Sequence, residues 1–202
     1  MAAPEVHAAA EHHTSTGLDN VKMAMWAFLG SECLFFGSLI TTYLLYRNRV
    51  IDGPKPHEIY DIPFTSVSSF VLLMSSLTMV LALAAIQRND PRGMRVWLIA
   101  TAFLGMAFVG GQIFEFTTFV DEGLNLSTST FGSSFFVLTG FHGAHVTVGI
   151  LMLLTLVGMS MAGRLGTTHL DQARKVELIG LYWHFVDIVW IVIFTLVYLI
   201  PS

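Results

Sequence analysis

Charge and cysteine are the two features this chain has least of. Of its 202 residues, 12% are charged and only one, Cys33, is a cysteine. Soluble domains carry about 25% charged residues, so the low charge predicts a membrane protein. A lone cysteine excludes an internal disulfide and any metal site built on a pair of cysteines.

The sequence also shows neither a cluster of basic residues nor the pattern of a secretory leader. Its net charge is −4 and its basic residues are scattered, which indicates no nucleic-acid partner. The start, M-A-A-P-E-V-H-A, has neither the basic region nor the apolar core of a signal peptide, so we expect residues 1–19 to be retained as a polar tail. No hydrophilic stretch is long enough to enclose a second core, and residues 20–202 are expected to form a single domain.

Long apolar stretches make up most of the chain, which is 54% hydrophobic. A helix needs about 20 mostly apolar residues to cross a bilayer. The sequence therefore predicts an all-α fold, an integral membrane bundle of five transmembrane helices. The expected spans cover about residues 20–46, 64–86, 94–119, 129–162 and 176–200.

The basic residues between the spans predict the orientation. If the N-terminus is cytoplasmic, seven basic residues lie inside and three lie outside, which agrees with the positive-inside rule. The C-terminus is then expected outside the membrane. The seven are Lys22, Arg88, Arg92, Arg95, Arg164, Arg174 and Lys175, and the three are Arg47, Arg49 and Lys55.

The last span carries an ionisable pair, His184 and Asp187, in the segment Y-W-H-F-V-D-I-V-W. Residues three apart lie on one face of a helix. Such groups are costly inside a bilayer unless they face protein, water or a partner. This helix therefore needs polar groups from elsewhere.

Two other spans carry buried polar residues. Glu32 has phenylalanines and leucine as its helical neighbours, so we expect its carboxyl to be hydrogen-bonded or to carry a proton. A bond between helices, proton handling and a ligand contact all remain open for it. His142 and His145 share a face in T-G-F-H-G-A-H-V, and they suit interhelical hydrogen bonding or metal binding. No Glu-x-x-His motif repeats on another span, as a di-iron bundle requires.

A single shared cluster is an economical arrangement for these groups, because each then supplies the others' partners. We therefore expect one buried polar cluster formed by Glu32, His142, His145, His184 and Asp187. Gln112 and Glu115, in G-G-Q-I-F-E-F, are expected to form an interfacial polar pair near the outer surface, where a carboxylate reaches water.

The two histidine motifs, T-G-F-H-G-A-H-V and Y-W-H-F-V-D-I-V-W, closely resemble signatures of subunit III of haem–copper terminal oxidases. S-E-C-L-F-F and the region of Gln112 and Glu115 match further landmarks of that family in the same order. The resemblance covers about residues 21–200 and is to the short bacterial form with five helices. Glu32 matches the family's buried glutamate, His142 and His145 the histidines near it, and His184 and Asp187 the polar pair of the last helix.

The resemblance implies an accessory subunit without catalytic residues, metal or cofactor of its own. Its partners would be oxidase subunit I, which holds haem and copper, subunit II, and structural phospholipids in a cleft of a V-shaped helix arrangement. A larger respiratory supercomplex is a further possible partner. The complex would be a proton-pumping cytochrome c oxidase of aerobic respiration in a bacterial inner (plasma) membrane, where this subunit supports proton uptake.

Side chains near the expected span ends are candidates for contact with lipid head groups. They are Trp26, Arg47, Trp97, Arg174 and Trp183.

Three alternatives remain open. Subunit III of a quinol oxidase, or a homologue associated with nitric-oxide reductase, has the same fold. A proton-coupled transporter would use the buried acids and histidines as a relay, although no inverted repeat is visible. A purely structural lipid-binding bundle is the third.

Overall fold

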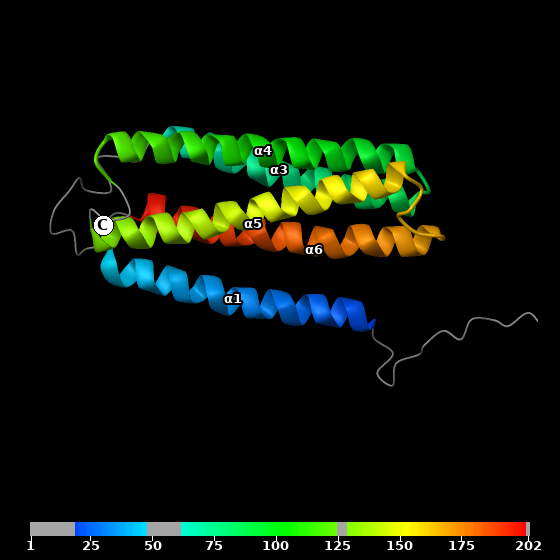
Figure 1. Cartoon of the computed structure of the whole chain (residues 1–202), viewed down its shortest axis with the longest axis horizontal. Helices are drawn as coiled ribbons and strands as arrows, with labels where there is room; N and C mark the ends of the chain where they lie inside the picture. Colours follow the sequence, from blue (N-terminus) through cyan, green and yellow to red (C-terminus); the bar gives the residue numbers. More distant parts are fainter. Residues whose placement is uncertain (1–18, 48–61, 125–128, 201–202) are drawn as a thin grey trace, which may run out of the picture.

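The described part of the protein is built from five long helices (Figure 1). The computed structural model describes residues 19–47, 62–124 and 129–200, and no strand occurs within these ranges. Each helix is long and apolar enough to cross a membrane, which confirms the predicted all-α fold with five spans. The helices are α1 (Asn20–Tyr46), α3 (Ile62–Gln87), α4 (Pro91–Asp121), α5 (Thr130–Met161) and α6 (His169–Phe194), the last continued by the π-helical segment η1 (Thr195–Leu199).

Capping residues set where four of the helices begin. An N-cap side chain accepts a hydrogen bond from a backbone N–H that the helix leaves without a partner. At the far ends of α4 and α5, Gly123 and Gly163 take positive φ angles of 93° and 67°, a conformation that glycine adopts without strain. The capping residues are Asp19, Asp90, Ser129 and Thr168.

The predicted bounds agree with α1 and fall short at α6. The helix α1 covers the expected residues 20–46, whereas α6 begins at His169 and not near Val176. Hydropathy detects only the apolar part of a helix, while Thr168 caps this one a further two turns upstream. As a result, His184 lies in the middle of the 31-residue segment formed by α6 and η1. Of the predicted tail, residues 1–19, all but Asp19 lie outside the described part of the chain.

The helix α1 is attached to the bundle along a narrow line. The other four helices pack together, and α1 lies along their side, against α5 and α6 (Figure 1). Its buried residues, Leu29, Phe36 and Tyr43, are spaced by seven, the interval at which a helix returns the same face to a neighbour. Most of its remaining surface is open, and Leu34 is 79% exposed. The V shape and its lipid cleft stay predictions.

The alternating direction of the helices gathers the basic residues at one end of the bundle. The described ranges contain eight of the ten lysines and arginines, because Arg49 and Lys55 lie outside them. Seven of the eight lie where α1 begins and α3 ends, and Arg47 lies at the opposite end (Figure 1). In the folded bundle, therefore, one end carries most of the basic residues and the opposite end carries few.

Two tryptophans of α6 hold that helix against α3. The indole N–H of Trp183 donates to Ser75 Oγ at 2.9 Å, and that of Trp190 donates to Ser69 Oγ at 2.8 Å. The ring of Trp183 is accommodated because Gly105 and Gly149 have no side chain. A Cβ at these glycines would come within 2.6 and 2.8 Å of the ring.

Removal of one of these hydroxyls should destabilise the bundle measurably. We expect Ser69→Ala to lower the free energy of unfolding by about 1 kcal/mol, because the buried Trp190 N–H loses its acceptor. Tryptophan fluorescence during thermal unfolding in detergent would measure the change. Ser38→Ala, at an exposed serine bonded to its own helix, is the matched control. Equal stability of the two variants would contradict the proposed anchoring.

Candidate functional site

Glu32 of α1 and His145 of α5 form a hydrogen-bonded pair inside the membrane domain. His145 Nε2 lies 3.2 Å from Glu32 Oε2, and both side chains are less than one fifth exposed. Phe35, Phe36 and Phe141 surround the pair: the first two have ring centres 6.1 and 4.9 Å from that of His145, and Phe141 packs edge-on to Phe35. Because rings offer no hydrogen bonds of this strength, the two side chains are each other's polar side-chain partner.

The second ring nitrogen of His145 determines what this pair can do. Nδ1 lies 2.7 Å from the carbonyl oxygen of Phe141, and a carbonyl can only accept a hydrogen bond. Nδ1 must therefore carry a hydrogen. The contact between Nε2 and Glu32 then holds one further proton, on either the imidazole or the carboxyl. Glu32 and His145 thus form a site that shares a single proton.

His142 lies one helical turn before His145 but has a different environment. It is fully buried, and neither ring nitrogen has a hydrogen-bond partner among the described residues. Its ring stacks on Trp190, with the ring centres 4.9 Å apart, and Phe108 packs edge-on at 5.9 Å. In this structure His142 is packed as an aromatic ring within the core.

His184 and Asp187 of α6 meet α3 through one serine. Ser76 Oγ lies 3.0 Å from His184 Nδ1 and also contacts Asp187 Oδ2. The other carboxyl oxygen, Asp187 Oδ1, is buried without a partner among the described residues. The last span therefore obtains its polar partner from α3.

The five residues of the expected cluster are not joined into one hydrogen-bonded group. Only Glu32 and His145 bond directly to each other, whereas His184 and Asp187 bond to Ser76, and His142 bonds to neither set. The reason is the arrangement of the helices. Glu32 reaches His145 from α1 to α5, whereas His184 and Asp187 of α6 are turned to Ser76 of α3, so the two sets lie on different sides of α6 and α5.

The predicted interfacial pair, Gln112 and Glu115, is buried. Each residue is 6% exposed, so the expectation that this carboxylate reaches water needs correction. Gln112 Nε2 donates to the carbonyl of Thr139 at 2.8 Å, and Thr65 Oγ1 donates to Glu115 Oε1 at 2.7 Å. Glu115 is buried because its face of α4 packs against α3, the helix that carries Thr65.

Two of the five lipid candidates keep a surface suited to that role. Trp26 is 58% exposed and Trp97 is partly buried. Trp183 does not fit it, because this residue is 1% exposed and bonded to Ser75. The early start of α6 carries Trp183 away from the span end into the core.

The two arginines among the lipid candidates tie helix ends together. Arg47 Nη2 donates to the carbonyl of Ile200 at 2.9 Å, and Arg174 pairs with Asp19 at 2.5 Å. Arg47 thus binds the end of α1 to the residue that follows η1, and Arg174 binds α6 to the N-cap of α1. Their role within the chain is attachment of the first helix.

The polar partners on α3 were not predicted. This helix supplies Thr65, Ser69, Ser75 and Ser76 to residues of α4 and α6. The signal was the density of hydroxyls in the second span, which reads F-T-S-V-S-S-F-V-L-L-M-S-S-L-T. Serine and threonine in membrane helices commonly hydrogen-bond to neighbouring helices.

The arrangement suits proton sharing and helix attachment. Within residues 19–47, 62–124 and 129–200, no three histidine, cysteine or acidic side chains gather as ligands for a metal ion. The single cysteine, Cys33, is exposed on α1.

The chain matches one protein family over nearly its whole length, namely cytochrome c oxidase subunit III, across residues 5–202. It is 40% identical to quinol oxidase subunit 3 of Bacillus subtilis over 94% of this chain and 91% of the relative. It is 39% identical to cytochrome c oxidase subunit 3 of Bacillus sp. (strain PS3), over 95% and 91% of the two chains. It is 38% identical to cytochrome bo(3) ubiquinol oxidase subunit 3 of Pseudomonas aeruginosa, over 94% and 88%.

These matches confirm the resemblance read from the histidine motifs. The relatives include subunits of quinol oxidases and of cytochrome c oxidases at nearly equal identity. All of these relatives are named as subunit 3 of an oxidase, and their names differ in the electron donor. The chain therefore belongs to the cytochrome c oxidase subunit III family of haem–copper oxidase subunits.

Proposed function

We propose that this chain is the accessory subunit III of a proton-pumping cytochrome c oxidase in aerobic respiration. In this role it binds no redox cofactor, and its partner subunits I and II hold the haem and copper. The observation that supports this best is the family match over residues 5–202, with the motif residues Glu32 and His145 paired inside the bundle. The subunit braces the catalytic subunit and supports its proton uptake.

The Glu32–His145 pair is the basis of the proton-handling part of this proposal. Its side chains are 18% and 19% exposed, so the site reaches the surface of the chain between α1 and α5. A pair that holds one exchangeable proton at such a surface can pass it to water or to a neighbouring subunit. Subunit I would be the receiver.

A quinol oxidase is the second candidate complex, because relatives at 40% and 38% identity carry that name. The electron donor binds to another subunit in either case. A copper site in the accompanying subunit II would favour cytochrome c, and its loss would favour quinol. A transporter relay is less well supported, since the polar groups form separate sets and no continuous chain across the bundle.

We further propose that the bundle lies in a bacterial inner (plasma) membrane with its N-terminus in the cytoplasm. The basic end of the bundle supports this orientation. Its helices of 26 to 32 residues extend about 39–48 Å, more than the roughly 30 Å hydrocarbon layer. Structural phospholipids would contact the open surfaces, with Trp26 and Trp97 near their head groups.

Loss of the shared proton site should shorten the working life of the oxidase and leave its chemistry intact at first. We expect Glu32→Ala to keep the initial rate of oxygen reduction, then to lose activity faster than the native complex during continuous turnover. The reason is that His145 loses its partner and α1 loses one of its bonds to α5. Oxygen consumption by the purified complex measures both phases.

The adjacent variant Cys33→Ala serves as the control, because this side chain is exposed on the same helix. It should behave like the native complex. Immediate and complete loss of oxygen reduction in Glu32→Ala, in an assembled complex with normal haem spectra, would argue against an accessory role.

Cysteine labelling tests the orientation. The labelling uses a Cys33→Ala background and a membrane-impermeant maleimide on intact protoplasts or spheroplasts. Glu122→Cys, which lies past the end of α4, should react with it. Arg164→Cys, between α5 and α6, should react only after the membrane is opened. The opposite pattern would show that the bundle is inverted.

A further inference from the structure

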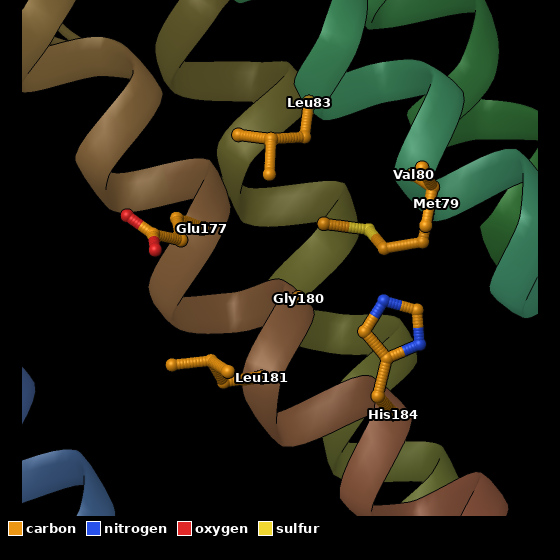
Figure 2. A pocket seen from close by; sticks show the side chains of 7 residues that line it. All are labelled: Met79, Val80, Leu83, Glu177, Gly180, Leu181 and His184. Atoms are coloured by element: carbon orange, nitrogen blue, oxygen red, sulfur yellow. The ribbon is translucent and has the colours of Figure 1, made fainter.

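A groove between α3 and α6 opens to the surface of the bundle. It encloses about 180 Å³ and runs past Gly180, whose missing side chain leaves room beside Met79 (Figure 2). Its lining is apolar except for one carboxylate and one imidazole. The lining residues are Met79, Val80, Leu83, Glu177, Gly180, Leu181 and His184.

The imidazole of His184 points into this groove. Figure 2 shows the ring directed from α6 towards Met79. Its Nδ1 lies 3.0 Å from Ser76 Oγ, and its Nε2 has no hydrogen-bond partner among the described residues. The carboxylate of Glu177 is occupied by Lys22 of α1, at 2.5 Å. Nε2 is therefore a polar atom of the lining that no described residue uses, at a level where the groove has no other polar side chain.

Counting hydrogens indicates that Nε2 is a donor. Ser76 has one hydroxyl hydrogen and contacts both His184 Nδ1 and Asp187 Oδ2. If it donates to Nδ1, Asp187 must donate to the serine, and the ring carries its hydrogen on Nε2.

If Ser76 donates to Asp187 instead, Nδ1 carries a hydrogen. A neutral ring then leaves either a lone buried carboxylate or a hydrogen on Asp187 Oδ1, which has no partner among the described residues. Both are costly within a bilayer. A charged ring would place an opposite charge near the carboxylate, and it again places a hydrogen on Nε2. The favourable arrangements all present an N–H to the groove.

An N–H that faces hydrocarbon without an acceptor is unfavourable, because lipid tails offer no hydrogen bonds. The occupant of the groove must therefore bring an oxygen to this depth. Glu177 and its partner Lys22 mark a polar level, and His184 lies seven residues further along α6, about 10 Å deeper. The acyl chains of a phospholipid carry no acceptor there, since its ester groups remain at the interface.

The size of the groove favours a side chain over a free ligand. Pockets for small molecules enclose roughly 300–1,000 Å³, whereas this groove holds about 180 Å³, the room for one large side chain. Gly180 lowers the helix surface at that point, and small residues of this kind allow membrane helices to approach closely.

We propose that a transmembrane helix of a neighbouring oxidase subunit packs into the α3–α6 groove and places an oxygen acceptor against His184 Nε2. The acceptor is a side-chain amide, a hydroxyl or a backbone carbonyl. This inference rests on the proposed role as an oxidase subunit, and it identifies a surface through which the chain binds its partner.

Two substitutions at His184 separate the groove contact from the internal one. In His184→Gln the amide nitrogen reaches the place of Nε2 and keeps a donor in the groove, while the bond to Ser76 is lost. In His184→Asn the amide stands near Nδ1, so the bond to Ser76 is kept and the groove donor is lost. We expect His184→Asn to reduce the amount of other oxidase subunits that co-purify with the tagged chain by about threefold to tenfold.

His184→Gln should co-purify near the native level. The reverse order would show that only the bond to Ser76 matters and would overturn the proposal. Thermal unfolding of both tagged variants in detergent shows whether either has lost its fold.

A photoreactive phenylalanine analogue at Leu181 or Val80, both in the groove lining, gives a second measurement that does not depend on His184. Illumination of the intact complex in membranes should join this chain to another protein subunit. Adducts with phospholipid or quinone alone would overturn the groove proposal. If the native chain co-purifies with no oxidase subunit, the proposed function itself fails, so the two failures are distinguishable.

Discussion

The constraint on which this structure depends is the cost of leaving a hydrogen-bonding group without a partner in hydrocarbon. Each helix carries a few such groups, and most are satisfied by a helix far away in the sequence. The indoles of Trp183 and Trp190 reach serines of α3, and Glu32 reaches His145 over 113 residues. Because these bonds have fixed geometry, they select one arrangement of five helices that apolar packing alone would leave less well defined.

The same constraint indicates where the chain is incomplete. A buried network that satisfies itself needs nothing further, as Glu115 does with Thr65. His184 is different, because one of its nitrogens faces an open groove. A subunit of a membrane complex can thus be recognised by the polar atoms it leaves for others. The family assignment and the geometry of α6 lead to the same view of this chain as a part that binds to a larger whole.

The spans were predictable from the sequence because burial in lipid requires long apolar runs, and α1 begins and ends where its composition indicates. The start of α6 was not, because Thr168 caps it outside the apolar stretch. Spacing placed His184 and Asp187 on one face of the helix but could not identify the helix that supplies their hydrogen-bond partner. That partner is Ser76, one of many hydroxyl residues in α3. Helix pairing is set by the packing of the whole bundle, so a single polar cluster was expected where the structure has separate ones.

The narrow attachment of α1 has a consequence for biosynthesis. Of the five described helices α1 is made before the others, yet its partners on α5 and α6 are made last. Glu32 precedes His145 by 113 residues, and at about 5–20 residues per second the glutamate waits roughly 6–23 s for its imidazole. During that interval Glu32 has no hydrogen-bond partner from α5, and Leu29, Phe36 and Tyr43 are not yet packed against other helices. An insertase or another nascent subunit that shelters it would set how much of the chain is assembled correctly.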